Sequence, residues 1–137
     1  MIPDDSSDSA TAIELENVDF RGQISVYVEP DCIYLYKEGS GNFSSLIGLA
    51  TGKCSVTQLA QTSTKRWRPS MVHYEGFIFL IGGVFQIFGE SLQSMEKFDI
   101  IQNTWTNAPS MNQSRHNHSS CVLGHKIFTF GGEDGND

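Results

Sequence analysis

The stretch that decides the fold occurs twice, as RWRPSMVHYEGFIFLIGG at residues 66–83 and as RHNHSSCVLGHKIFTFGG at residues 115–132. The second copy begins 49 residues after the first, and the two align without a gap. Identical residues pair as Arg66/Arg115, Ser70/Ser119, Ile78/Ile127, Phe79/Phe128, Gly82/Gly131 and Gly83/Gly132. A repeat with a period of about 20 to 50 residues indicates one supersecondary unit written several times.

Each copy predicts short strands. Ile78 to Ile81 and Ile127 to Phe130 are apolar runs suited to buried strands, and a glycine pair follows each where the backbone must turn. Met95 to Phe98 and Thr104 to Ala108 predict the third and fourth strands, and Asp99 is expected to cap the turn between them. Four short antiparallel strands at a period near 50 residues make one blade of a β-propeller.

A weaker copy begins 45 residues before the first one. Its matches to the stronger copy are Arg21/Arg66, Ser25/Ser70, Ile33/Ile78 and Leu35/Leu80. It has Lys37-Glu38 where the other copies have two glycines, and Ile24 to Val28 predicts a strand. We therefore expect an all-β chain of about two and a half four-stranded blades. These are a degenerate blade at 21–65, a complete blade at 66–114, and the first half of a truncated blade at 115–137.

The net charge of −7 is concentrated at the N-terminus. Residues 1–20 hold six of the sixteen acidic residues and no Lys or Arg, so they are expected to form an acidic, disordered leader. The remaining chain is almost neutral. It lacks the basic surface that phosphate backbones require, so no nucleic acid is expected as a partner.

Cysteine usage and hydropathy predict a cytoplasmic protein. Cys32, Cys54 and Cys121 are odd in number and form no CxxC pair, which favours free thiols in a reducing compartment. The acidic N-terminus has no apolar signal region, and the longest apolar stretch, from Phe77 to Phe85, is too short to span a bilayer. No membrane partner is expected.

The repeated pattern resembles the kelch repeat. The resemblance rests on the glycine pairs, on Arg115 at the start of a unit, on Glu96-Lys-Phe-Asp99 and on Asn103-x-Trp105, and it covers residues 21–137. It implies a disc of about six four-stranded blades in which the diglycine ends the second strand of each blade. Structural roles are implied for Arg66, Gly82, Gly83, Phe98, Asp99, Trp105, Arg115, Gly131 and Gly132, with Trp105 packed between neighbouring blades.

The resemblance also implies a function. Kelch discs usually serve as docking platforms for another protein, as substrate receptors of ubiquitin ligases or as scaffolds, so a non-enzymatic binding module is expected. Residues just after the opening arginine often contact the ligand in this family, which implies Arg68, His116 and Asn117. Phe85 and Phe88, in an apolar loop after the first diglycine, would form a hydrophobic anchor if exposed, or would fold onto the adjacent blade.

Catalysis and metal binding are not expected. The one metal-like constellation is His116, His118, Cys121 and His125, but ligands spread along one strand end more than about 10 Å apart, so four of them cannot converge. No GxSxG, phosphate loop or HExxH occurs, and no cofactor is expected.

Two alternatives stay open. A closed propeller needs on the order of 180 to 400 residues, so the missing blades would come from a longer chain or from self-association. The chain could therefore be a fragment of a kelch-disc copper oxidase, which gathers Tyr, Cys and His ligands from many blades. It could also be a non-functional truncated remnant.

Overall fold

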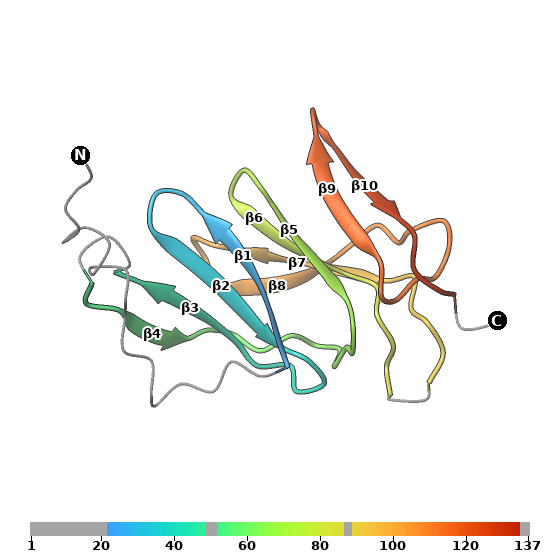
Figure 1. Ribbon diagram of the computed structural model, residues 1–137, viewed down its shortest axis with the longest axis horizontal. Coiled ribbons are helices and arrows are strands. Elements are labelled where there is room, and N and C mark those ends of the chain that lie inside the picture. Colours follow the sequence, from blue (N-terminus) through green and yellow to red (C-terminus); the bar gives the residue numbers. More distant parts are fainter. Residues whose placement is uncertain (1–21, 49–51, 87–88, 135–137) are drawn as a thin grey trace, which may run out of the picture.

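The computed structural model describes residues 22–48, 52–86 and 89–134, so the leader predicted for residues 1–20 lies outside the described residues. The described chain is all-β, as predicted, with three antiparallel sheets side by side in chain order (Figure 1). We call these sheets blades 1, 2 and 3. Blade 1 contains β1 (Gln23–Val28), β2 (Cys32–Lys37), β3 (Phe43–Ile47) and β4 (Ser55–Gln58). Blade 2 contains β5 (Ser70–Tyr74), β6 (Phe77–Ile81), β7 (Met95–Asp99) and β8 (Thr104–Ala108), and blade 3 contains β9 (Ser119–Leu123) and β10 (Lys126–Phe130).

The strand register confirms the alignment of the two strong repeats. Ser70 pairs with Ile81 in blade 2, and Ser119 pairs with Phe130 in blade 3. Ser119 follows Ser70 by 49 residues, and Phe130 follows Ile81 by the same 49 residues. Two residues join the paired strands in each case. Because the turns have equal length, the same sequence positions face the same way in the two blades.

The alignment of the weak copy cannot hold in both strands of its first hairpin. Ser25 pairs with Leu35, whereas Ser70 pairs with Ile81, the neighbour of Leu80. The pairs Ser25/Ser70 and Leu35/Leu80 therefore cannot both be equivalent. The reason is the turn, which has three residues between β1 and β2 but two between β5 and β6. One extra turn residue moves every later side chain relative to the first strand.

Blade 1 has a glycine in the diglycine position, one residue later than the alignment predicts. The N–H of Gly83 donates to the carbonyl of Arg115 at 2.8 Å, and the N–H of Gly39 donates to the carbonyl of Arg66 at 2.7 Å. Both glycines have positive φ, 95° and 75°, which favours a residue without Cβ. Gly39, and not Lys37-Glu38, is thus the counterpart of the second glycine.

An aromatic core joins blade 1 to blade 2. Its buried members are Tyr34, Tyr36 and Phe43 from blade 1 and Ile78, Leu80 and Phe98 from blade 2. The ring of Trp105 lies 4.9 Å from that of Phe43 and 5.2 Å from that of Phe98, and its Nε1 donates to the carbonyl of Ala60 at 2.8 Å. The prediction that Trp105 packs between neighbouring blades is confirmed.

Asp99 caps the turn between β7 and β8, as predicted. Its Oδ1 accepts hydrogen bonds from the N–H groups of Ile101 and Gln102, each at 3.0 Å. A short polar side chain that bonds to the backbone two or three residues on is a typical turn-forming device. The carboxylate is therefore used locally, within its own blade.

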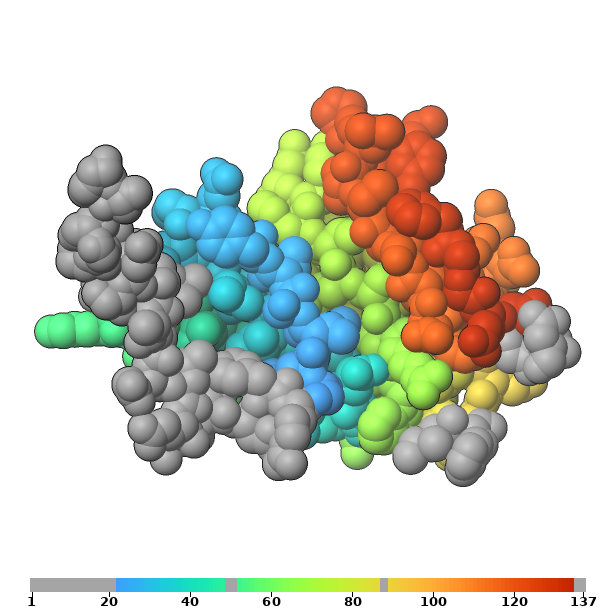
Figure 2. Space-filling model, in the orientation of Figure 1, coloured from blue at the N-terminus to red at the C-terminus, as the bar shows by residue number. Residues whose placement is uncertain are grey.

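Blade 3 stands at one end of the row (Figure 2). On it, Leu123, Phe128 and Phe130 are exposed, at 68%, 44% and 52%. The counterparts of the last two in blade 2 are Phe79, which is half-buried, and Ile81, which is fully buried. The difference in exposure follows from the position of the blades. Blade 3 covers this face of blade 2, whereas no described residue covers the same face of blade 3. None of the described residues belong to a helix that could cross a membrane.

Candidate functional site

Two exposed residues occupy the same unusual backbone position in consecutive blades. Arg68 and Asn117 are 49 residues apart, and each has a positive φ, 55° and 60°. The N–H of Asn117 donates to the carbonyl of Arg68 at 3.0 Å, and the N–H of Arg68 donates to the carboxylate of Glu38 in blade 1. These bonds link the loops before β5 and β9 to the loop after β2, so they join all three blades. Left-handed backbone at non-glycine residues is uncommon and concentrates at functional sites.

Arg68 and Asn117 line a cavity of about 630 Å³. Glu38, Pro69, His118, Ser119 and Ile24 complete its wall, so residues from all three blades contribute. The cavity combines a cation, a carboxylate and an amide with few apolar groups. Two of the three residues predicted from the loops after the opening arginines are therefore brought together here.

The third predicted loop residue, His116, lies elsewhere. Its backbone forms a bridge to Glu133, with N–H to carbonyl distances of 2.9 and 3.0 Å, which repeats the bridge between Trp67 and Val84 one blade earlier. Its imidazole has Nδ1 at 2.6 Å from the Ser91 hydroxyl and Nε2 at 3.5 Å from the Glu133 carboxylate. The His116 side chain is only 12% exposed, so these contacts use most of its surface.

The apolar loop after the first diglycine is described only in part. Phe85 is 52% exposed and does not line the cavity beside Arg68. Phe88, the other predicted anchor, lies outside the described residues together with Ile87. The exposure of Phe85 is compatible with a contact surface. Isolated apolar side chains are also common on protein surfaces, so this exposure alone does not identify a binding site.

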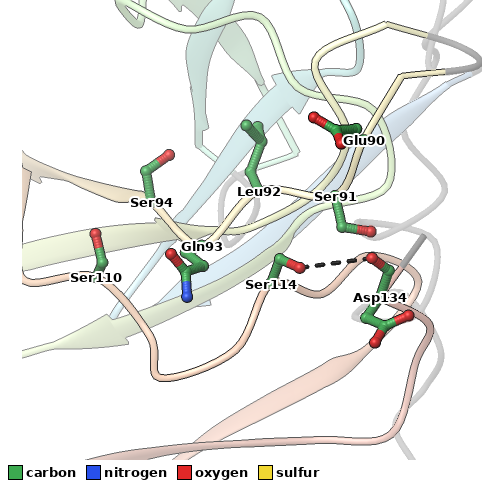
Figure 3. Close-up of a pocket in the computed structure, with 8 residues that line it drawn as sticks. All are labelled: Glu90, Ser91, Leu92, Gln93, Ser94, Ser110, Ser114 and Asp134. Carbon is green, nitrogen blue, oxygen red and sulfur yellow. Dashed lines mark hydrogen bonds between the residues drawn. The ribbon is translucent and has the colours of Figure 1, made fainter. Parts of the chain in front are cut away.

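A second polar cavity, of about 400 Å³, lies between the β6–β7 loop and blade 3 (Figure 3). Glu90, Ser91, Gln93 and Ser94 approach it from one loop, and Ser110, Ser114 and Asp134 from segments that flank blade 3, with Leu92 completing the wall. The Ser114 hydroxyl is 3.5 Å from the Asp134 carbonyl. Among the described residues, Ser91 is the one group in this cavity that contacts a base able to activate a nucleophile, the His116 imidazole.

Arg66 is a structural residue at the centre of a buried network. Its guanidinium contacts the Glu96 carboxylate through Nε and Nη2, each at 3.2 Å, and both side chains are almost fully buried. Its Nη1 donates to the carbonyls of Gly82 and Ser94 at 2.8 Å. Ser63 completes the carboxylate shell, because its N–H and hydroxyl both donate to Glu96 at 2.9 Å. Burial lowers the pKa of Arg66, although the Glu96 charge opposes this shift.

His118 stands between blades 2 and 3. Its Nε2 lies 2.9 Å from the Ser70 hydroxyl, which in turn lies 2.5 Å from the Ser120 hydroxyl. Its Nδ1 is buried without a hydrogen-bond partner among the described residues. Burial lowers the pKa of His118 to about 4, and the charges of Arg115 and His116 act in the same direction. His118 is therefore neutral at physiological pH.

The histidines of the metal-like constellation have separate partners. His116 contacts Ser91, His118 contacts Ser70, and the His125 Nδ1 contacts the Tyr74 hydroxyl. Cys121 is exposed. Within residues 22–48, 52–86 and 89–134, no three His, Cys, Asp or Glu side chains come together as a metal site.

Sequence reasoning missed three polar side chains. Glu96 was noted only as part of a motif, although its position three residues before a turn aspartate places it on the same strand face as Phe98. Glu38 stands at the counterpart of Gly82, and its bond to the Arg68 N–H appears only in three dimensions. The sequence singles out His118 only as part of the metal-like constellation. The feature that could have pointed to its polar contact is the serine at the repeated position, Ser70 and Ser119.

Comparisons with known proteins agree with this geometry. A family model described as the kelch motif matches residues 65–112, which contain all four strands of blade 2. No curated protein matches the sequence significantly. Among solved structures, the one titled "Structure of YjhT" matches with a TM-score of 0.75 and 19% sequence identity over 90% of this chain. This chain spans only 37% of that one. The chain thus carries a kelch motif and has the fold of part of a kelch-repeat propeller.

Proposed function

We propose that this chain is a non-enzymatic protein-interaction module that binds its partner through the loop face formed by Arg68 and Asn117. One observation carries the proposal. Both residues adopt left-handed backbone, both are exposed, and they line one cavity with Glu38. Strained backbone persists where the surrounding structure holds it in place, and it is frequent at ligand-contacting positions.

The side-chain chemistry supports a protein as the ligand. The Arg68 guanidinium makes no ion pair with any described residue, and arginine is among the side chains most enriched at binding hot spots. Phe85, on the loop after the first diglycine, adds an exposed aromatic ring. A scaffold or substrate receptor would use such a surface without chemical change to its partner.

An intracellular location is part of the same proposal. Cys32, Cys54 and Cys121 are all free thiols. Free cysteines are typical of proteins in reducing compartments. The partner is therefore expected to be another intracellular protein.

The test compares two charge-removing variants of the same loop. Arg68→Asn removes the cation and keeps a residue that tolerates left-handed backbone, and Lys65→Asn removes a neighbouring exposed cation as the matched control. In affinity capture from cells that express the protein, followed by quantitative mass spectrometry, Arg68→Asn should lose a partner that wild type and Lys65→Asn retain. Circular dichroism should be the same for all three proteins. Equal capture by Arg68→Asn and wild type would contradict the proposal.

A further inference from the structure

His116 makes a side-chain contact between blades that the repeat itself does not require. His116 and Trp67 occupy equivalent positions, 49 residues apart, and their backbones form equivalent bridges. The Trp67 ring lies so close to Gly39 that a Cβ on this glycine would fall 2.3 Å from the ring. His116 has an imidazole in place of this indole, and the imidazole contacts the Ser91 hydroxyl. The contact is therefore a property of this sequence and not of the blade architecture.

Ser91, His116 and Glu133 form a relay of a hydroxyl, an imidazole and a carboxylate. The Ser91 Oγ lies 2.6 Å from His116 Nδ1, and His116 Nε2 lies 3.5 Å from the Glu133 carboxylate. The carboxylate favours the imidazole tautomer with its proton on Nε2, which leaves Nδ1 able to accept the hydroxyl proton. This order of groups activates a serine in the Ser-His-Asp triad, here with the two ring nitrogens exchanged, and it is recognised by geometry.

The imidazole is held in place, and the hydroxyl that it contacts is accessible. The His116 side chain is only 12% exposed, so it has little room to turn away. Ser91 lines the cavity of about 400 Å³, on the side of its loop that faces Ser114 and Asp134 (Figure 3). The carboxylates of Glu90 and Asp134 line the same cavity and repel an anionic group. A small uncharged group therefore suits this cavity better than an anionic or a long apolar one.

Donors that repeated turnover would need are already used. Hydrolysis of an acyl-serine requires hydrogen-bond donors aimed at the developing oxyanion. The N–H of Leu92, directly after Ser91, donates to the Gly83 carbonyl at 2.7 Å. Gln93, which also lines the cavity, donates from Nε2 to the Asn112 carbonyl at 3.2 Å. This geometry favours one attack on an activated acyl donor over repeated hydrolysis.

We propose that Ser91 is an acyl-acceptor site that takes one small uncharged acyl group from an activated ester or thioester. The Ser91 Oγ forms a bond to the acyl carbon as the C–O or C–S bond of the donor breaks. The hydroxyl proton passes to His116 Nδ1 and from there to the leaving alkoxide or thiolate, and the product is an O-acylserine. The site shares no lining residue with the Arg68 cavity and goes beyond the proposed function. The chain stays non-enzymatic, because Ser91 is modified once and is not regenerated.

The probe is p-nitrophenyl acetate, added to the full chain, and peptide mass spectrometry follows the acetyl group on each serine with time. Ser91 should be acetylated at least about a hundredfold faster than Ser110 and Ser114, since it has a general base beside it. These two serines are matched controls within one molecule. They line the same cavity, and neither hydroxyl contacts a histidine in the part of the chain that the structure describes. His116→Gln, which keeps a polar side chain but cannot take up the proton, should lower the Ser91 rate to that of the two controls.

Acetylation of Ser91 at the rate of Ser110 and Ser114 in the wild-type chain would overturn the proposal. This comparison does not depend on the folding of any variant. An unchanged Ser91 rate in His116→Gln would also overturn it. Loss of the acetyl group from Ser91 within minutes of removing the reagent would show turnover and would contradict a single transfer. Partner capture through Arg68 enters none of these outcomes, so the two proposals can fail separately.

Discussion

The contact between blades 1 and 2 and the contact between blades 2 and 3 are built from the same repeat but from different chemistry. The first is an aromatic core in which Phe43, Phe98 and Trp105 pack ring against ring. The second places the hydroxyl of Ser70 against His118 and Ser120. Aromatic pairs and buried apolar area stabilise the first contact, whereas the second depends on the satisfaction of buried polar groups.

The two arginines show the same contrast at one side chain. Arg66 is enclosed by a third strand and by the segment that follows the previous blade. Arg115 has the same local sequence position and the same bond to a glycine carbonyl, but it lacks the third strand among the described residues. A repeat position therefore fixes where a side chain points, and the neighbouring strand decides whether it is a core residue or a partly exposed one.

The largest effect is expected when the two arginines are replaced in turn. Arg66→Leu should lower the free energy of unfolding by about 3–5 kcal/mol, because it leaves the buried Glu96 charge unpaired. Arg115→Leu should lower it by less than about 1 kcal/mol, because the Arg115 guanidinium is partly in solvent and has no carboxylate partner among the described residues. Urea unfolding measures both values. Equal losses of unfolding free energy in the two variants would show that Arg66 and Arg115 do not differ in burial or in partners.

A smaller difference is expected between equivalent glycines. A Cβ on Gly82 would lie 2.5 Å from the carbonyl oxygen of Arg115, whereas a Cβ on Gly131 would have no atom of the described residues within 4 Å beyond its two neighbours in the chain. Both have positive φ, so Gly131→Ala should cost about 1–2 kcal/mol from backbone strain alone. Gly82→Ala should cost about 1–3 kcal/mol more, because the blade contact must shift. Thermal unfolding of the two variants makes the comparison, and a larger loss at Gly131 would contradict the described contact.

The polar contact should also make stability depend on pH. The pKa of His118 is lowered to about 4 in the folded chain, below the ordinary value of 6.5, so the unfolded state binds more protons between these values. Stability from this group is complete above about pH 6.5 and is lost as the pH falls towards 4, with a slope of at most about 1.4 kcal/mol per pH unit. His118→Gln should remove this component. Urea unfolding from pH 4 to 7 that shows the same slope in both proteins would exclude His118 as its source.

The sequence predicted most of the fold because the decisive features are local. The spacing of Gly82 and Gly131, the apolar runs before them and the turn aspartate Asp99 each specify strands or turns within a few residues. The placement of Trp105 between blades came from the family resemblance, and its ring contacts with Phe43 confirm it. The error at Ser25 arose from the longer turn between β1 and β2, which an ungapped alignment cannot represent.

The site was less predictable because it depends on contacts between blades. Arg68 and Asn117 could be selected from their repeat position, but their left-handed backbone and the link to Glu38 appear only in three dimensions. His116 was selected by the same reasoning, yet Ser91 and Glu133 hold its ring away from the cavity. Such partners lie 17 to 30 residues away in the sequence, beyond the range of local patterns.

The most direct test of this account compares hydrogen exchange at the Nε–H groups of the two arginines by NMR. The Arg66 Nε–H donates to the Glu96 carboxylate in a fully buried position, whereas the Arg115 Nε–H has no acceptor among the described residues. At neutral pH the Arg66 Nε–H should exchange with water at least about a hundredfold more slowly than the Arg115 Nε–H, since exchange requires opening of the buried pair. Exchange at equal rates would contradict the assignment of Arg66 to the core and of Arg115 to a partly exposed position.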